Sequence, residues 1–255
     1  MRVNRRVAAL VAALLLGVGP EAHAQAPAAI QRVKTSIVAV GTYQRTRSPA
    51  FQFRGTGFAV AEGLTIVTNA HVLPATIDAD KLETIAILVP SGQREALLRP
   101  ATRGAVDVEH DLALLAVEGS PLPALALRDS DSVREGESVL FTGFPIGNVL
   151  GPFPATHRGM VAAITPIAIP PAHASQLDPA MIRRLAAGAF PVFQLDATAY
   201  PGNSGSPVYA PDTGEVIGVV NMVFVKGTKE AALTQPSGIS YAIPSRYLIE
   251  LLKRR

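Results

Sequence analysis

The sequence contains no cysteine among its 255 residues. This absence excludes a disulfide framework, a thiolate nucleophile and any metal site built on cysteine sulfur. Repeats of solenoid length and low-complexity tracts are also missing, and the 21 glycines and 21 prolines are dispersed along the chain. Hydrophobic residues make up 48% of the chain and charged residues 17%. This balance is typical of a globular protein with a large core.

The apolar run near the N-terminus is too short to span a bilayer comfortably. It covers Val7–Val18, which is 12 residues, whereas a transmembrane helix needs about 20. Three arginines precede the run, and Ala22-His23-Ala24 follows it, as in a signal peptide with its cleavage site. We therefore expect residues 1–24 to be a signal peptide and the mature protein to be exported, either periplasmic or secreted, without an integral membrane span. A signal anchor is the alternative interpretation.

Neither sign of charge is in large excess. The full chain has 23 basic and 20 acidic residues. Cleavage after Ala24 would remove three arginines and Glu21, leaving 20 basic and 19 acidic residues. A nearly neutral protein gives no indication of a nucleic-acid or membrane partner. The sequence leaves the oligomeric state open.

Many short apolar segments with turn residues between them predict an all-β fold. A proline-containing polar segment, Glu118–Glu137, divides them into two halves, which we expect to form two barrels over residues 30–125 and 133–255. Residues 25–29 are expected to be a flexible start, and a short helix over Tyr247–Arg255, with Ser245 as its N-cap, closes the chain. The expected strands are Val33–Thr42, Arg54–Val60, Leu64–Thr68, Glu83–Val89, Glu95–Arg99, Leu112–Val117, Ser138–Thr142, Gly159–Ile164, Val192–Leu195, Val216–Val225 and Gly238–Ile243.

The stretch from Pro201 to Pro207 holds a serine between glycines, in the order Gly202-Asn203-Ser204-Gly205. Glycine tolerates positive φ and leaves the backbone bare. Such a turn can aim consecutive N–H groups at one point and hold a hydroxyl beside them. This is the geometry needed to attack a carbonyl and then stabilise the oxyanion. An ordinary turn between two strands is the alternative.

Two further residues complete a possible catalytic set. His71 ends an apolar strand, and Asp111 directly precedes Leu112–Val117. A lone histidine at such a place is more often structural, and a lone aspartate is usually a turn or cap residue. Together with Ser204, however, they supply a base, a carboxylate to orient it and a nucleophile.

The other histidines and acids indicate no metal site. Asp107 and His110 are expected to be solvated turn residues beside Asp111, and we assign no role to His157 or His173. Metal binding needs convergent ligands at a recognisable spacing, which the sequence does not contain. We therefore expect no metal and no cofactor.

These motifs resemble those of the trypsin-like, chymotrypsin-fold serine proteases, most closely the bacterial Deg/HtrA branch. The resemblance runs from about Val33 to the C-terminus. The histidine and the aspartate are 40 residues apart, and the aspartate and the serine are 93 residues apart. The matching pieces are Arg54-Gly55-Thr56-Gly57-Phe58, Thr68-Asn69-Ala70-His71-Val72, His110-Asp111-Leu112-Ala113-Leu114-Leu115, Pro201-Gly202-Asn203-Ser204-Gly205 and Gly238-Ile239-Ser240-Tyr241-Ala242-Ile243-Pro244.

The resemblance implies two antiparallel six-stranded β-barrels and a serine endopeptidase acting on protein or peptide substrates. Ser204 would attack the peptide carbonyl, His71 would accept its proton, and Asp111 would fix the imidazole tautomer. The backbone N–H groups of Gly202 and Ser204 would form the oxyanion hole. The chain departs from the family pattern in two places. Ser206 stands where that branch usually has a second glycine. We also expect no PDZ domain after the second barrel.

The resemblance also places a specificity pocket next to the nucleophile. Thr198 would form its base, and its walls would be formed by Asn221, Met222, Val223, Ser240, Tyr241 and Ala242. None of these residues offers a carboxylate to pair with lysine or arginine, and an unpaired buried charge is costly. The pocket is therefore expected to prefer uncharged, small-to-medium side chains.

Two alternatives compete with a catalytic trypsin-like protein. An α/β-hydrolase requires Gly-x-Ser-x-Gly and the order serine, acid, histidine. Ser206 breaks that motif, and the order here is reversed. A non-catalytic peptide-binding relative on the same scaffold remains the alternative, although no triad residue is replaced.

A long connection is expected within the second half, over Thr165–Pro191. Pro166, Pro170 and Pro171 argue against a regular central strand at its start. Asp178–Gly188 has the pattern of a short helix, with proline at its first position and glycine at its end. We expect this excursion to shape or gate the active site, against the alternative of a surface insertion.

Overall fold

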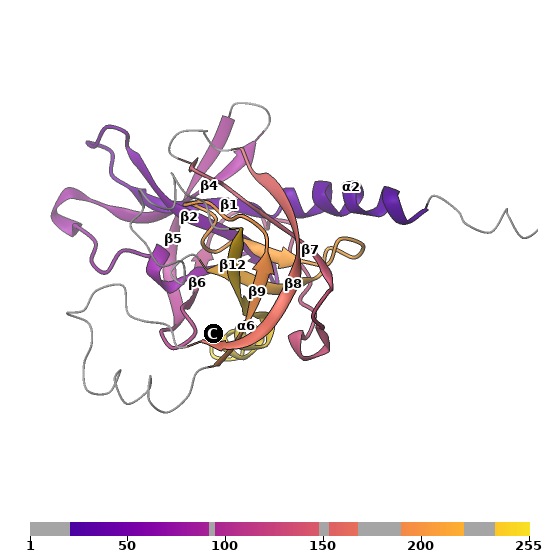
Figure 1. Ribbon diagram of the computed structural model, residues 1–255. Coiled ribbons are helices and arrows are strands. Elements are labelled where there is room, and N and C mark those ends of the chain that lie inside the picture. The colour runs from indigo at the N-terminus through magenta and orange to yellow at the C-terminus, as the bar shows by residue number, and fades with distance from the viewer. Residues whose placement is uncertain (1–20, 92–94, 148–152, 168–189, 222–237) are drawn as a thin grey trace, which may run out of the picture.

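The computed structural model describes residues 21–91, 95–147, 153–167, 190–221 and 238–255. These residues form two closed barrels, each of six antiparallel strands (Figure 1). The predicted fold class is therefore confirmed. In the first barrel the strands follow the order β1-β2-β3-β6-β5-β4, and in the second the order β10-β11-β12-β9-β8-β7.

The strand bounds agree with the predicted ones to within a few residues in most cases. The first barrel consists of β1 (Ile37–Tyr43), β2 (Phe51–Val60), β3 (Thr65–Asn69), β4 (Thr84–Ser91), β5 (Glu95–Asp107) and β6 (Leu112–Val117). The second consists of β7 (Ser138–Gly143), β8 (Ala155–Ile167), β9 (Phe190–Asp196), β10 (Pro207–Tyr209), β11 (Val216–Asn221) and β12 (Ile239–Pro244). Short 3-10 turns cover Ala70–Val72 (η1), Ala79–Lys81 (η2) and Ser130–Ser132 (η3).

The largest hydrophobic cluster joins the two barrels. Phe58 and Leu112 enter it from the first barrel, and Phe144 and Val219 enter it from the second. All residues of β3 and β11 are buried. Burying one such large apolar side chain contributes roughly 1.5–3 kcal/mol, so this shared core fixes the position of one barrel against the other.

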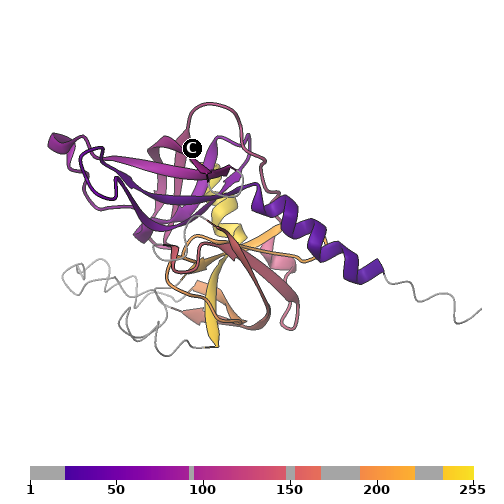
Figure 2. The same ribbon diagram turned by 90° about the horizontal axis from the view of Figure 1, so that it is seen from above.

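The C-terminal helix α6 (Ser245–Leu252) lies between the barrels (Figure 2). Leu248 and Leu251 are fully buried, and the helix contacts β5 and β6 of one barrel and β11 and β12 of the other. The predicted N-cap was wrong. Pro244 holds that position, whereas Ser245 is already helical and its Oγ donates to the Arg128 carbonyl at 2.5 Å.

The expected flexible start at residues 25–29 was also wrong. Helix α2 covers Glu21–Lys34, and β1 begins only at Ile37. Ala29 and Val33 are buried, while Ala26 and Ile30 pack against the same core. These four positions have the i, i+3, i+4, i+7 spacing of an amphipathic helix, a signal that the sequence analysis overlooked.

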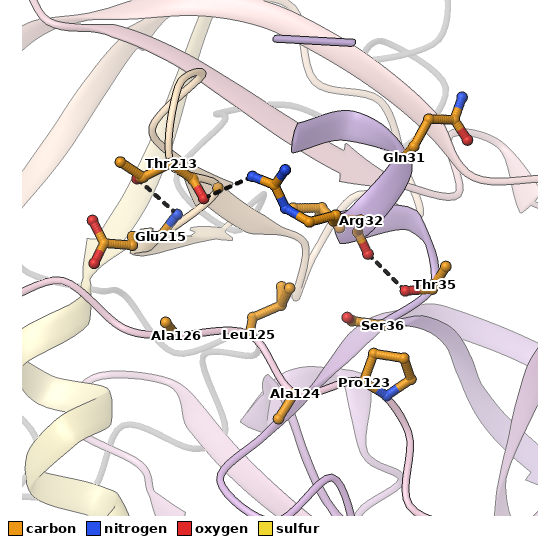
Figure 3. A pocket seen from close by; sticks show the side chains of 12 residues that line it. Gln31, Arg32, Thr35, Ser36, Pro123, Ala124, Leu125, Ala126, Thr213 and Glu215 are labelled. Atoms are coloured by element: carbon orange, nitrogen blue, oxygen red, sulfur yellow. Dashed lines mark hydrogen bonds between the residues drawn. The ribbon is translucent and has the colours of Figure 1, made fainter. Parts of the chain in front are cut away.

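Helix α2 borders a pocket together with the linker between the barrels and the turn at Thr213 (Figure 3). Arg32 Nη2 donates to the Thr213 carbonyl at 3.2 Å. Ser36 Oγ is buried, and it has no hydrogen-bond partner among the described residues. The helix thus attaches the start of the first barrel to a turn of the second.

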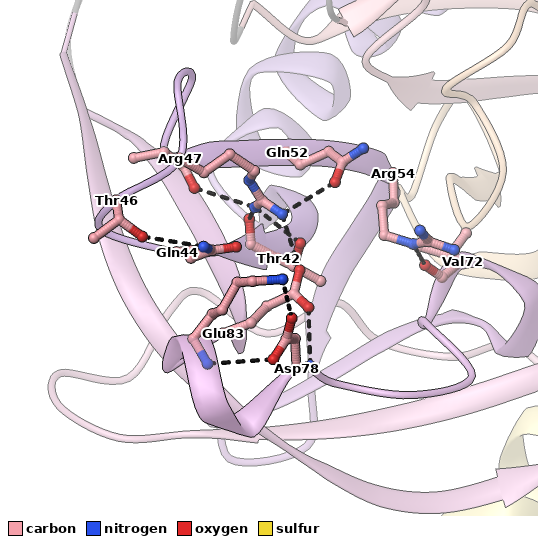
Figure 4. A network of polar contacts seen from close by, with 11 residues as sticks. Thr42, Gln44, Thr46, Arg47, Gln52, Arg54, Val72, Asp78 and Glu83 are labelled. Carbon is pink, nitrogen blue, oxygen red and sulfur yellow. Dashed lines mark hydrogen bonds and ion pairs between the residues drawn. The ribbon is translucent and has the colours of Figure 1, made fainter.

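One arginine closes the loop between β1 and β2 (Figure 4). Arg47 Nη2 donates to the carbonyls of Thr42 and Ala50 at 2.8 and 3.2 Å, and Nη1 donates to Glu83 Oε1 at 2.9 Å. Its partners lie on both sides of the loop and directly before β4. This side chain therefore holds the loop against the barrel.

The excursion in the second barrel is shorter than predicted. Strand β8 continues through Pro166 to Ile167, and Pro166 is paired with Pro191 of β9. The argument that Pro166 precludes a strand was wrong here. Two opposed prolines leave no ladder N–H unpaired, and β7 does not pair with β8 beyond Met160. The remainder of the excursion, including the helix expected at Asp178–Gly188, lies outside the described residues.

Neither of the two α-helices in the described residues is both long and apolar enough to cross a membrane.

Candidate active site

His71, Asp111 and Ser204 meet where the two barrels face each other. His71 Nδ1 lies 2.5 Å from Asp111 Oδ2, and His71 Nε2 lies 3.0 Å from Ser204 Oγ. Asp111 and Ser204 are buried, and the His71 side chain is 27% exposed. A carboxylate, an imidazole and a hydroxyl are thus in one hydrogen-bonded chain.

His71 is held by a turn that bends around Asp111. Strand β3 ends at Asn69, and η1 carries His71 directly afterwards. The Asn69 side-chain amide and the Ala70 backbone N–H both donate to the Asp111 carbonyl, at 3.0 and 3.1 Å. The His71 backbone N–H donates to Asp111 Oδ1 at 2.9 Å. The imidazole therefore has few orientations open to it.

The Asp111 carboxylate is equally constrained. Its backbone adopts a left-handed φ of 53°, directly before β6. Besides the two hydrogen bonds to His71, Oδ2 accepts one from Asn221 Nδ2 at 2.7 Å. Donors thus face both carboxylate oxygens, which holds the carboxylate in one orientation.

The contact between Asn221 and Asp111 predicts a positioning role for Asn221. Asn221→Leu keeps the side chain's approximate size but removes the donor. Because a hydrogen bond to a charged group contributes about 1.5–3 kcal/mol, we expect kcat to fall tenfold or more while KM changes little. Steady-state kinetics on a peptide substrate measure this split. A raised KM at unchanged kcat would contradict the prediction.

The nucleophile turn depends on two glycines in unusual conformations. Gly202 has a φ of +101° and Gly205 a φ of +87°. A Cβ at Gly202 would lie 2.3 Å from the Phe144 carbonyl oxygen, and one at Gly205 would lie 2.0 Å from the Thr56 carbonyl oxygen. Both conformation and space therefore require glycine.

Two backbone N–H groups of this turn make no hydrogen bond within the described residues. The Ile146 N–H donates to the Pro201 carbonyl at 2.7 Å. Since the peptide is trans, the Gly202 N–H points the opposite way. Neither the Gly202 N–H nor the Ser204 N–H has an acceptor in the described part of the chain. These are the two groups predicted to form an oxyanion hole.

Thr56 connects the first barrel to this turn, a contact that the sequence analysis missed. Its backbone N–H donates to the Ser204 carbonyl at 2.9 Å, and its Oγ1 donates to the Gly202 carbonyl at 2.7 Å. The same Oγ1 accepts from the Phe144 N–H at 3.1 Å. The only sequence signal was the Gly55-Thr56-Gly57 motif, which did not indicate what the hydroxyl would contact.

The described residues of the predicted specificity pocket lie on neighbouring strands. Thr198 follows β9 and is half-buried; Ser240–Ala242 belong to β12, which pairs with both β9 and β11. Ser240 Oγ donates to the Ala197 carbonyl and so ties the Thr198 segment to β12. Asn221 is opposite Tyr241, but its side chain is engaged with Asp111. Met222 and Val223 lie outside the described residues.

Asp107 and His110 were wrongly expected to be solvated. Asp107 is buried, and its carboxylate accepts from the His110 backbone N–H at 3.0 Å and lies 2.8 Å from Nδ1. Burial acts to raise the pKa of Asp107, but the hydrogen bonds from His110 outweigh it and lower that pKa overall. The His110 ring stacks on Tyr247 of α6 at 3.8 Å. This pair therefore supports the Asp111 turn from the inter-barrel side.

His157 lies on β8 of the second barrel and makes none of the triad's hydrogen bonds among the described residues. Its ring stacks on Phe141 at 4.8 Å, and burial lowers its pKa. Within the described ranges no three histidine or carboxylate side chains are grouped so that they could hold a metal ion.

Comparisons with known proteins identify the family of this chain. Residues 55–219 match the model of the trypsin-like peptidase domain, and the chain belongs to that family. It is 36% identical over 202 residues to mitochondrial serine protease HTRA2 of Bos taurus, covering 78% of this chain and 36% of the relative. A probable periplasmic serine endoprotease DegP-like protein of Ectopseudomonas mendocina is 31% identical over 201 residues, covering 78% and 34%.

A solved structure, HtrA-type protease AlgW with tripeptide, shares the fold with a TM-score of 0.63 and 24% identity. The alignment covers 89% of this chain and 62% of that one. The chain spans about a third of the length of the curated relatives that it matches. The comparisons thus establish the family and the fold, and the activity is argued below from the site.

Proposed function

We propose that this protein is a serine endopeptidase that hydrolyses protein substrates through an acyl-enzyme. The observation that carries the proposal is the continuous chain from Asp111 Oδ2 through His71 to Ser204 Oγ, with separations of 2.5 and 3.0 Å. Both are hydrogen-bond distances. They join a nucleophile to a base and the base to an orienting carboxylate.

The reaction follows from this geometry. His71 Nε2 accepts the Ser204 proton as Oγ attacks the peptide carbonyl, and it then donates that proton to the leaving amine. Asp111 holds the proton-bearing Nδ1 and stabilises the imidazolium. Water, activated by the same histidine, then hydrolyses the ester. The N–H groups of Gly202 and Ser204 bind the developing oxyanion, each worth roughly 3 kcal/mol in the transition state.

On the acyl side, the pocket should take uncharged side chains. None of its described members, Thr198, Asn221 and Ser240–Ala242, carries a carboxylate. A lysine or arginine entering it would lose hydration without gaining an ion pair from them. Peptide libraries read by mass spectrometry should therefore give small or medium uncharged residues before the cleaved bond. A profile dominated by lysine or arginine would contradict this assignment.

The protein is proposed to act after export, in the periplasm or outside the cell. The DegP-like relative is described as periplasmic, and residues 1–24 have the pattern of a signal peptide. The positions of α2 that pack on the core, Ala26, Ala29, Ile30 and Val33, all follow the expected cleavage site. Removal of residues 1–24 would leave Pro27 in the first turn of the shortened helix, where proline is tolerated.

Hydrolysis of an unfolded protein tests the proposed function. Purified protein should degrade fluorescein-labelled casein, and Ser204→Ala should not, although both melt at the same temperature. Peptide mapping should find new termini within the substrate rather than only at its ends. Equal residual activity in the two proteins would indicate a contaminating protease, and no activity in either would favour the non-catalytic peptide-binding alternative.

A further inference from the structure

Two arginines from different strands of the first barrel bind the segment that follows His71. Arg54 of β2 donates from Nε to the Val72 carbonyl at 2.6 Å, and the two side chains lie together in Figure 4. Arg103 of β5 donates from Nη2 to the Pro74 carbonyl. Both arginines are exposed. Each is thus anchored by one nitrogen while its charge faces solvent.

The two anchoring points are close to each other. Val72 and Pro74 are two residues apart, so even in an extended chain their carbonyls are separated by about 7 Å. A guanidinium has five N–H donors. Arg54 and Arg103 each use only one nitrogen in the contacts described above, so most of their donors remain available to a ligand. Among the ion pairs of the described residues, neither Arg54 nor Arg103 takes part in one. The fold has therefore placed two positive charges, neither with an ion-pair partner among the described residues, beside one short segment.

This segment borders the place where the leaving half of a substrate must lie. His71 Nε2 gives its proton to the leaving amine, so the chain beyond the cleaved bond passes His71 and the residues behind it. Strand β2 forms the adjacent wall. A Cβ at Gly55 would lie 3.0 Å from the Ser204 carbonyl oxygen and 2.7 Å from Val72 Cγ2. The acyl side, with Thr198 and β12, belongs to the other barrel.

We propose that Arg54 and Arg103 form a subsite that binds a carboxylate in the part of the substrate on the C-terminal side of the cleaved bond. The proposal rests on the proposed function and adds a substrate preference to it. The Nε contact of Arg54 leaves its two terminal nitrogens as a fork, the geometry that binds a carboxylate in a bidentate manner. The carboxylate belongs either to an aspartate or glutamate side chain or to the substrate's C-terminus.

Matched peptides test this subsite. Quenched fluorescent peptides should carry glutamate or its neutral isostere glutamine at each of the first three positions after the cleaved bond, each with a free or an amidated C-terminus. At low salt, kcat/KM should favour the charged peptide about fivefold at one position, the size of an exposed ion pair. Sodium chloride should weaken the preference by screening.

Variants assign the preference to the two side chains. Arg54→Gln should reduce the ratio of kcat/KM for the charged peptide to kcat/KM for the neutral peptide to about one or two. Arg54→Lys should keep part of the preference. The double variant Arg54→Gln with Arg103→Gln should abolish it. Arg45→Gln is the matched control, because Arg45 is an exposed arginine of the same barrel with no ion pair among the described residues. This control should keep the full ratio.

The outcomes separate this inference from the proposed function. A ratio of one in the parent protein, or a ratio that survives the double variant, would overturn the subsite although cleavage continues. If no peptide is cleaved, the proposed function fails, and the binding of the same peptides to Ser204→Ala by fluorescence anisotropy decides the subsite. In that binding experiment, a preference for the charged peptide that is lost with Arg54→Gln supports the subsite, and equal binding of the charged and neutral peptides overturns it. Dependence on the free C-terminus, rather than on glutamate, would identify that source of the carboxylate.

Discussion

Asp111→Asn should lower kcat by about ten-thousand-fold while leaving the protein folded. In the structure the His71 backbone N–H donates to Oδ1, whereas His71 Nδ1 and Asn221 Nδ2 face Oδ2. An asparagine would keep its oxygen toward the backbone N–H and turn its NH₂ toward Nδ1. Nδ1 would then have to accept, the proton would move to Nε2, and the imidazole could no longer take the Ser204 proton.

Single-turnover kinetics on a peptide ester or amide measure this loss. Asp80→Asn is a suitable control because Asp80 is exposed and lies outside the triad; it should keep full activity. Thermal unfolding should show that both variants are folded. A decrease in kcat of less than tenfold for Asp111→Asn would mean that Asp111 does not set the tautomer of His71.

Gly202→Ala should cost about a hundred- to thousandfold in kcat, the loss typical of one oxyanion donor. The φ of +101° disfavours any side chain, and the new Cβ would lie 2.3 Å from the Phe144 carbonyl oxygen. The peptide must therefore shift, and the Gly202 N–H moves away from the oxyanion position. Because substrate binding depends on other contacts, KM should change far less than kcat.

A substitution at a second glycine, Gly136, separates the effect of backbone strain from the loss of an oxyanion donor. Gly136 also has a positive φ, of +86°, but a Cβ there would meet nothing within 4 Å. Gly136→Ala should show only the conformational cost, about 1–2 kcal/mol, as a lower melting temperature at unchanged kcat. Nearly normal turnover in Gly202→Ala would exclude the Gly202 N–H from the oxyanion hole.

The three residues of the site could be predicted from sequence because each lies in a local motif. His71 lies just after strand β3, Asp111 directly precedes β6, and Ser204 lies between Gly202 and Gly205, so short stretches specify their backbone. The partners of these residues could not be found in this way. Asn221 and Thr56 act across the interface between the barrels, and only the packing of one barrel against the other brings them to their targets.

The fold was predictable to a similar degree. Turn residues between short apolar segments indicated the barrels, but the three-residue strand β10 is too short to leave a pattern of its own. Helix α2 was missed although its apolar spacing is helical, because residues 25–29 were taken as a flexible start and Val33 as the beginning of a strand. Strand β8 passes through Pro166 because its partner there is another proline, which a single segment cannot reveal.

The central claim is that Ser204 is a nucleophile activated by His71. Intact-protein mass spectrometry after treatment with a fluorophosphonate tests it most directly, because the reagent attaches to an activated serine whether or not a good substrate is known. We expect one adduct per chain on the parent protein, mapped to Ser204 by peptide sequencing, and none on Ser204→Ala or His71→Ala. Undiminished labelling of Ser204→Ala, or no labelling of the folded parent, would contradict it.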